Sequence, residues 1–342
     1  GSFRTEALGQ SWVVIDSEVS KHSDDAFRRD LVSDFRTALF ELSPKARWSD
    51  RLKRAASVLR SFSISVDPSG SLTAGVDVAA LEGQADSGNL HRDLSDLFVA
   101  IGEAAQEQGR GVVLLYDEVQ FLTQPQLEAL IAALHKTVQR GLPVTMVGAG
   151  LPQIAELAGD AKSYAERLFK FPRIGSLSDA DASRALADPA ESEGATFSPG
   201  ALDLAVELTE GYPYFIQELG YAVWGVAGGP TITPDDVEAA LPLYESKLDS
   251  SFFRVRLDRA TEMQRVYLRA MAELGAAPQK AADVAALLDR TSPQVAPTRA
   301  ELIAMGLLYT PEHGYAAFTV PHFDKFMKRA IPDLEVPPVR RR

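Results

Sequence analysis

The chain has 342 residues, of which 46% are hydrophobic and 24% are charged, and its formal net charge is −12. This length and composition indicate two or three folded domains and exclude a chain that is mostly disordered, collagenous or coiled coil. Because the chain has no cysteine and only five scattered histidines, disulfides, thiolate metal sites and zinc chemistry are excluded as well.

No apolar run approaches the roughly 18 residues of a membrane helix, and no basic segment precedes an apolar one at the start. We therefore expect a cytoplasmic protein without a membrane partner. The acidic balance argues against coating of nucleic acid by the whole chain, since phosphate binding needs concentrated positive charge. Residues 246–342, however, carry about 15 Lys and Arg against about 11 Asp and Glu, so a polyanion would meet the C-terminal third.

Residues 3–175 predict an α/β core. Apolar strands are expected at 11–16, 111–117 and 143–148, a short irregular strand at 169–174, and helices at 25–42, 93–108, 125–140 and from 151 onward. Continuously apolar strands separated by helices indicate a parallel sheet that is covered on both faces. The alternation of apolar and polar residues at 61–78, around Asp67-Pro-Ser-Gly70, predicts an inserted β-hairpin.

The rest of the chain predicts a lid and a winged helix. Residues 176–250 contain four helical patterns, two of which begin with a hydroxyl residue followed by proline, at Ser198-Pro199 and Thr233-Pro234. Residues 251–333 contain three helical patterns and then a hairpin with strands at 307–310 and 315–320, which is typical of a winged helix-turn-helix. Residues 334–342 are expected to form a mobile basic tail.

Two acidic residues, Asp117 and Glu118, end the apolar run that begins at Val112. The carboxyl ends of buried parallel strands are where open α/β sheets bind ligands. There Asp117 can hold Mg²⁺, directly or through water, and Glu118 can orient a water for attack on a terminal phosphate. In the structural alternative, either acid interacts only with the amides of the next helical turn.

The order of these elements resembles P-loop ATPases of the AAA+ and STAND type, particularly the bacterial and archaeal ATP-binding proteins related to replication initiators. An acid-tipped strand is followed by helix, strand, helix, an arginine, a last strand, a helical lid and a winged helix, so the resemblance covers nearly the whole chain. It implies an ATPase with ATP or ADP and Mg²⁺ as cofactors. Asp117 and Glu118 would form its Walker B motif, with Asp117 on the metal and Glu118 catalytic.

The resemblance implies roles for two further motifs. Arg167 lies where such families often place an arginine finger, and Gly211-Tyr212-Pro213 resembles the GxP signature of STAND proteins, whose proline lies against the nucleotide. Each motif has a structural alternative. Arg167 could simply pair with Glu166 or Asp160 on a helix surface, and the glycine and proline could simply end one helix and begin the next.

The sequence departs from that family at two places. The loop after the strand expected at 143–148 is Ala149-Gly150, without the Asn, Thr or Ser that usually senses the γ-phosphate, and no G-x-x-x-x-G-K-[ST] occurs anywhere. Without that loop, no backbone nest and no P-loop lysine receive the phosphates. The resemblance aligns residues 3–10 with the end of the helix that follows the P-loop, and residues 11–16 with the second strand. We therefore expect a fragment that begins just after the phosphate loop, behind a Gly1-Ser2 tag remnant.

A truncated sheet leads to two expectations. This chain should bind ATP weakly or not at all and should not hydrolyse it. The segments 143–148 and 169–174 should be separated by a gap or rearranged, because the strand that belongs between them is missing, and their free edges would favour self-association.

The predicted winged helix is a second candidate site, where polar side chains could read DNA base edges and basic ones could bind phosphates. The candidate contacts lie on its third helix and beside it: Arg290, Gln294, Thr298, Arg299, Lys325, Lys328 and Arg329. Against DNA binding, Pro297 interrupts the third helix, and winged helices of STAND proteins frequently serve as packing or oligomer surfaces. Fold analogy alone does not give DNA binding.

Two functional hypotheses follow. In the first, the chain is part of an AAA+/STAND-like ATPase in which nucleotide between core and lid controls the position of the winged helix. In the second, it is a non-enzymatic winged-helix DNA-binding regulator whose degenerate α/β core is only a scaffold. A phosphate loop encoded upstream of Phe3 would favour the first hypothesis, and its absence the second.

Overall fold

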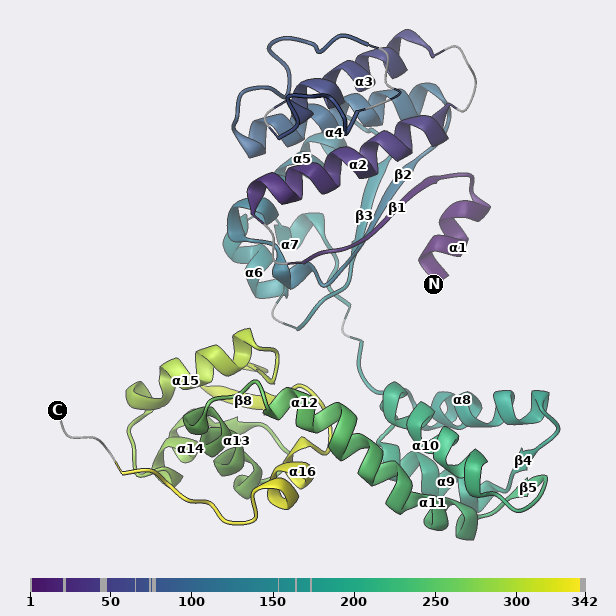
Figure 1. Ribbon diagram of the computed structural model, residues 1–342, viewed down its shortest axis with the longest axis vertical. Helices are drawn as coiled ribbons and strands as arrows, with labels where there is room; N and C mark the ends of the chain where they lie inside the picture. The colour runs from purple at the N-terminus through teal and green to yellow at the C-terminus, as the bar shows by residue number, and fades with distance from the viewer. Residues whose placement is uncertain are drawn as a thin grey trace. The chain divides into compact units, whose positions relative to one another are not determined.

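The computed structural model describes residues 2–20, 23–43, 48–64, 66–73, 75, 78–152, 154–163, 165–172 and 174–338. Contacts divide the chain into two compact units, residues 1–172 and 173–342 (Figure 1). The prediction of an α/β fold with a parallel sheet, followed by a largely helical region, is confirmed. Within the described residues, no helix has the length and apolar character needed to cross a membrane.

A three-stranded parallel sheet forms the centre of the N-terminal unit. Its order is β1-β2-β3, with β1 at Val13–Glu18, β2 at Val112–Asp117 and β3 at Val144–Gly148. Val112 pairs with Val13 on one side and with Val144 on the other. Because parallel strands run in one direction, the carboxyl ends of all three strands lie at the same edge of the sheet.

Helices α2 to α5 form a layer beside the strands of this sheet (Figure 1). The helices of the N-terminal unit are α1 (Ser2–Gly9), α2 (Asp24–Leu42), α3 (Asp50–Ser63), α4 (Leu90–Glu107), the 3₁₀ turn η1 (Val119–Phe121), α5 (Gln124–Gln139), α6 (Ile154–Ala161) and α7 (Ala165–Leu168).

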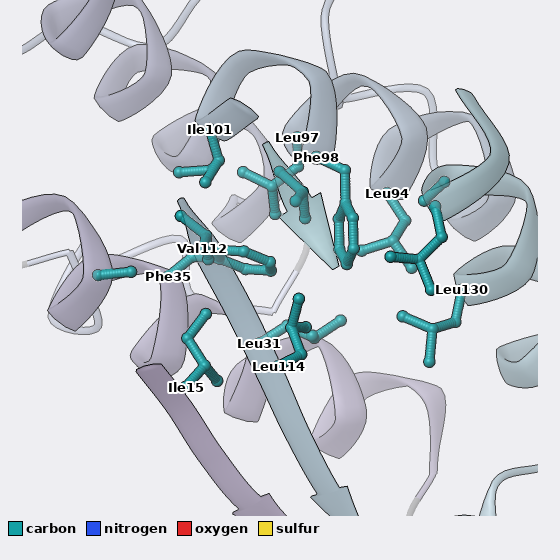
Figure 2. Packing of buried hydrophobic residues seen from close by; sticks show 14 of the residues in the cluster. Ile15, Leu31, Phe35, Leu94, Leu97, Phe98, Ile101, Val112, Leu114 and Leu130 are labelled. Carbon is teal, nitrogen blue, oxygen red and sulfur yellow. The ribbon is translucent and has the colours of Figure 1, made fainter. Parts of the chain in front are cut away.

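The α2 helix shows how the sequence builds the core. Its first turn is capped by the hydroxyl of Ser23, which accepts a hydrogen bond from the amide of Ala26. Apolar residues then recur every fourth position, and Leu31 and Phe35 point into the core (Figure 2). The ring of Phe35 meets the ring of Phe98 from α4 edge-on, with 5.1 Å between centroids.

A buried ion pair joins α2 to α4 within the same layer. The Arg28 guanidinium donates to the Asp93 carboxylate at 3.0 Å, and the two side chains are 7% and 1% exposed. Asp93 also accepts hydrogen bonds from the amide and hydroxyl of Ser87, while Arg28 lies over the Phe62 ring. Each charge therefore has partners, which makes its burial tolerable.

The C-terminal unit is mostly helical. Its helices are α8 (Asp179–Ser192), α9 (Pro199–Thr209), α10 (Pro213–Val226), α11 (Pro234–Lys247), the π-helical turn η2 (Leu248–Phe253), α12 (Arg254–Leu257), α13 (Glu262–Leu274), α14 (Ala281–Leu287), α15 (Ser292–Ala304) and α16 (Phe323–Ala330). Two short strands, β4 (Thr196–Phe197) and β5 (Thr231–Ile232), pair in parallel, and an antiparallel sheet of order β6-β8-β7 joins Gln279–Lys280, Tyr315–Phe318 and Leu308–Tyr309.

Aromatic side chains dominate the core of the C-terminal unit. Phe215 of α10 lies at its centre and contacts the rings of Phe252, Phe253 and His322. Phe253 in turn stacks on Phe326 of α16 at 5.1 Å. These contacts bring the predicted lid helices and the C-terminal helices into one hydrophobic cluster.

The predicted β-hairpin at 61–78 is wrong for the residues that the structure describes. Ser61–Ser63 form the end of α3, and residues 66–73 form turns; positions 65, 74, 76 and 77 of the segment lie outside the described residues. The Asp67 carboxylate accepts from the amide of Leu72 at 2.6 Å and from the hydroxyls of Ser69 and Ser71. These local side-chain bonds satisfy polar groups that a hairpin would have paired across strands.

The strand expected at 169–174 is also not observed, since residues 169–172 and 174 have no strand conformation and residue 173 lies outside the described part. Pro172 cannot donate to a ladder, which is consistent with this result. Segment 143–148 therefore pairs with β2 but with no other strand that the structure describes. The expected gap or rearrangement between 143–148 and 169–174 is not tested, because the second segment forms no strand among the described residues.

Two local predictions in the C-terminal unit also differ from the structure. Pro297 does not interrupt the third helix of the predicted winged helix, because α15 continues through it, although proline has no amide to donate to the helix. Thr233 caps α11 as predicted, whereas the Ser198 hydroxyl, at the start of α9, is buried without a hydrogen-bond partner.

Candidate functional site

Asp117 and Glu118 lie at the carboxyl edge of the sheet, where β2 ends. Asp117 is exposed, and its Oδ1 accepts from the amide of Glu118 at 2.8 Å. Glu118 itself has a left-handed conformation with φ of 56°, which is uncommon for a residue with a side chain. The backbone thus turns sharply at the acid pair, and unusual conformations of this kind cluster at functional sites.

Gln120 connects this turn to the loop that follows β3. Its side-chain amide donates to the Glu118 carboxylate, while its Oε1 accepts from the amide of Leu151 at 3.1 Å. The backbone adds two more bonds, from Val119 to Ala149 and from Ala149 to Tyr116. The orientation of Glu118 is therefore set by a side chain that the sequence analysis missed, two positions after the acid pair.

The same contact explains the small residues after β3. A Cβ atom at Gly150 would lie 2.6 Å from Oε1 of Gln120 and 2.9 Å from a methyl group of Val119. A larger residue at position 150 would therefore force Gln120 or Val119 to shift, because the two loops approach closely.

A half-buried carboxyl lies on α2 near the sheet. Burial, helped by the negative charge of Asp30 and opposed by a hydrogen bond with Ser17, raises the pKa of Asp34 to about 6. Burial likewise raises the pKa of Tyr116, with the two aspartates adding to the effect. Side chains alternate along a strand, so Tyr116 and the neighbouring Asp117 point to opposite faces. Asp34 is therefore not part of the exposed acid pair.

A magnesium site would depend on Asp117 and on a bound phosphate together. No group of three or more His, Cys, Asp or Glu within the described ranges could hold a metal ion by itself. This agrees with the coordination of Mg²⁺ in proteins, which usually binds one or two carboxylates and completes its coordination shell with water and substrate oxygens.

Arg167 belongs to the short helix α7 and is exposed. It makes no ion pair with Glu166, with Asp160 or with any other residue in the part of the chain that the structure describes. The structural alternative of a surface ion pair thus finds no support, and the arginine-finger role stays a prediction.

The Gly211-Tyr212-Pro213 motif lies in the C-terminal unit and joins α9 to α10. Gly211 has φ of 67°, and a Cβ there would lie 2.5 Å from the carbonyl oxygen of Leu177. The amide of Leu177 donates to the Gly211 carbonyl at 2.8 Å, and Pro213 is the first residue of α10. The structural role of the glycine is therefore established by its contacts, whatever ligand the motif also meets.

Two of the candidate DNA contacts are held by protein groups. Arg329 forms a two-pronged pair with Asp249, with nitrogen to oxygen distances of 3.0 and 2.5 Å, and this pairing raises the pKa of the guanidinium. Arg290 donates to the carbonyl of Pro337 at 2.9 Å. Both residues are less available to phosphates than the sequence suggested.

The other candidate contacts remain at the surface to different degrees. Gln294 and Lys328 are exposed, whereas Thr298 and Arg299 are partly buried. The side-chain oxygen of Gln294 caps α15 by accepting a hydrogen bond from the backbone amide of Thr291. The α15 helix packs on α13, α14 and β7 of its own unit. Lys325 is also exposed and lies 3.9 Å from Glu210.

Solved structures with a similar fold include a Walker-type ATPase. The chain is similar to the Walker-type ATPase PABY2304 of Pyrococcus abyssi, with a TM-score of 0.54 and 14% identity over 96% of this chain and 87% of that one. It also matches Cdc6p from Pyrobaculum aerophilum, with a TM-score of 0.41 and 11% identity over 96% of this chain and 84% of that one. A third match is the Orc1 protein of Aeropyrum pernix in complex with DNA, with a TM-score of 0.39 and 13% identity over 96% of this chain and 81% of that one.

Sequence comparison adds one family. Residues 250–327 match a domain of unknown function, DUF8462, and the curated proteins give no match. The family match overlaps most of the region predicted as a winged helix, residues 251–333. The likeness to the P. abyssi ATPase, at low identity, shows the fold: an α/β core followed by a helical C-terminal region.

Proposed function

We propose that this chain is the core, lid and winged helix of an AAA+/STAND-like ATPase that binds ATP or ADP with Mg²⁺. The observation that carries the proposal is the acid pair at the carboxyl end of β2, with the Glu118 carboxylate held by Gln120. In this proposal Asp117 holds Mg²⁺, and Glu118 orients the attacking water. The shared fold with a Walker-type ATPase supports it.

The phosphates need a further element. The sequence contains no G-x-x-x-x-G-K-[ST], and β3 pairs on one side only among the described residues. A strand that carries a phosphate loop can add along that free edge, where the loop would reach the tip of β2. In the assembled protein Arg167 would act as the arginine finger, and Gly211-Tyr212-Pro213 would bring the lid to the nucleotide.

The test measures ATP binding and turnover by this chain and by any longer product of its gene that carries a phosphate loop. We expect the 342-residue chain to show no saturable ATP binding below about 1 mM, and a longer product with a phosphate loop to bind ATP with Mg²⁺. In the longer product, Glu118→Gln should keep ATP binding and lower turnover about 100-fold or more, because a general base contributes that much.

Asp117→Asn and Glu82→Gln complete the set. Asp117→Asn should weaken Mg²⁺-dependent binding, while Glu82→Gln, which changes an exposed acid away from the strand tip, should change neither binding nor turnover. Unchanged turnover in Glu118→Gln would assign that residue a structural role. Absence of ATP binding in the longer product would overturn the proposal.

DNA binding through the C-terminal unit is a second candidate function, and the exposed Lys325 and Lys328 on α16 favour it. In that case the chain is a DNA-binding regulator, with or without ATPase activity. Phosphate contacts release counterions, so binding would fall steeply with added salt. A gel-shift titration of duplex DNA at two salt concentrations tests this, with Lys328→Glu expected to weaken the shift; no shift at low ionic strength would exclude DNA as a partner.

A further inference from the structure

A hollow of about 560 Å³ opens on the N-terminal unit beside the last turns of α2. Arg36, Thr37, Phe40 and Glu41 line it from α2, and Arg110 lines it from the segment that leads into β2. Small-molecule sites commonly have volumes of about 300 to 1,000 Å³, so the hollow is large enough for a ligand of that kind.

This hollow lies at the edge of the sheet opposite the acid pair. The Arg110 Nε donates to the carbonyl of Ser11 at 2.7 Å, and both residues come shortly before their strands, β1 and β2. Asp117 stands at the other end of β2. A strand rises about 3.3 Å per residue, so about 20 Å separates the two edges. The hollow is therefore distinct from the proposed nucleotide site.

Arg36 has donor capacity that the protein does not use. Its Nε is buried without a hydrogen-bond partner, and its guanidinium lies 5.8 Å from the centroid of the Phe40 ring. Within the described part of the chain it forms no ion pair. A buried donor without an acceptor costs free energy. The two terminal nitrogens of Arg36 also make no hydrogen bond with a described residue and are available to an anionic ligand in the hollow.

Arg110 and Phe40 are held in place around Arg36. Arg110 donates to the carbonyls of Ser11 and Glu41, which fixes its guanidinium and leaves the second terminal nitrogen without a partner among the described residues. The Phe40 ring is 37% exposed and meets the Trp48 ring edge-on at 5.4 Å. Two guanidinium groups and one aromatic face thus border the same space.

We propose that this hollow binds a small aromatic carboxylate. The carboxylate would accept hydrogen bonds from Arg36 and Arg110, and the ring would lie against Phe40. Glu41 is the one acidic side chain on the lining, and its charge opposes the ligand. Loss of a lining arginine should therefore lower the affinity for the carboxylate, and loss of Glu41 should raise it.

The experiment titrates the purified chain with indole-3-propionate by calorimetry, and with tryptamine as the analogue that lacks a carboxylate. We expect saturable binding of indole-3-propionate below about 5 mM, and binding of tryptamine at least about tenfold weaker. Arg36→Met, which keeps the aliphatic stem, should lower the affinity for indole-3-propionate about tenfold, and Phe40→Leu should lower it several-fold. Glu41→Gln should raise this affinity.

Arg29→Met is the matched control, because Arg29 is an exposed arginine on the same helix and does not line the hollow. It should leave binding unchanged, and circular dichroism should show that every variant remains folded. The proposal is overturned if the wild-type chain shows no saturable binding, if tryptamine binds as well as indole-3-propionate, or if folded Arg36→Met binds as tightly as wild type.

Discussion

The two units use their candidate functional residues differently. In the N-terminal unit Asp117 and Arg167 are exposed and take part in no ion pair with a described residue. In the C-terminal unit Gly211, Arg290 and Arg329 are all engaged in contacts within the unit. These three residues therefore have structural roles that must be separated from any functional ones, whereas Asp117 and Arg167 of the first unit can be tested more directly.

The largest expected effect comes from the buried ion pair of the N-terminal unit. Arg28→Met leaves Asp93 buried without its cation, and breaking a buried pair from one side costs about 3 to 5 kcal/mol. Urea unfolding, followed through Trp12 and Trp48 in a Trp224→Phe background, measures this loss. Arg54→Met, which removes an exposed ion pair at 4.0 Å, should cost under about 1 kcal/mol.

A smaller effect is expected at the lid motif. Gly211→Ala places a Cβ 2.5 Å from a carbonyl oxygen at a positive φ, so the C-terminal unit should lose about 2 kcal/mol. Gly225→Ala on α10 is the matched control, because a Cβ there meets nothing within 4 Å; it should stabilise by about 0.5 to 1 kcal/mol. Thermal melts measure both, and equal changes would contradict the structural role of Gly211.

Stability should also depend on the protonation of Asp34. Its pKa is about 6 in the folded chain against an ordinary 3.8, so the folded state binds the proton more tightly than the unfolded state. Stability contributed by this group is present at low pH and is lost as pH rises from about 4 through about 6. Asp34→Asn should therefore gain about 1 kcal/mol over wild type at pH 7.5 and less at pH 4.5, as urea unfolding at both values would show.

The smallest effect separates two neighbouring cations on α16. Arg329→Gln loses the pair with Asp249 and should cost about 0.5 kcal/mol, because the pair is partly exposed. Lys328→Gln should leave stability unchanged. If the unit binds DNA, the order should reverse in a salt titration, with Lys328 contributing more to the salt dependence than the paired Arg329.

Much of the fold could be predicted because the spacing of apolar residues along a strand or helix is a local signal. The strands β1, β2 and β3 are continuous apolar runs, and α2 repeats its apolar residues every fourth position with Ser23 as its cap. These signals depend on a few neighbouring residues. The segment at 61–78 was mispredicted since alternation of apolar and polar residues also fits a helix end followed by turns, and the bonds of Asp67 decide between them.

The sequence by itself determined the α/β character of the first unit, the helices of the second and the acid pair at the end of β2. Only the tertiary structure decided which side chains contact one another. It shows that Gln120 orients Glu118, that Gly150 and Gly211 lie against neighbouring loops, and that Arg329 pairs with Asp249. The physical reason is separation along the chain. Arg329 and its partner are 80 residues apart, and no periodicity in the sequence records a contact between segments that meet only when the chain folds.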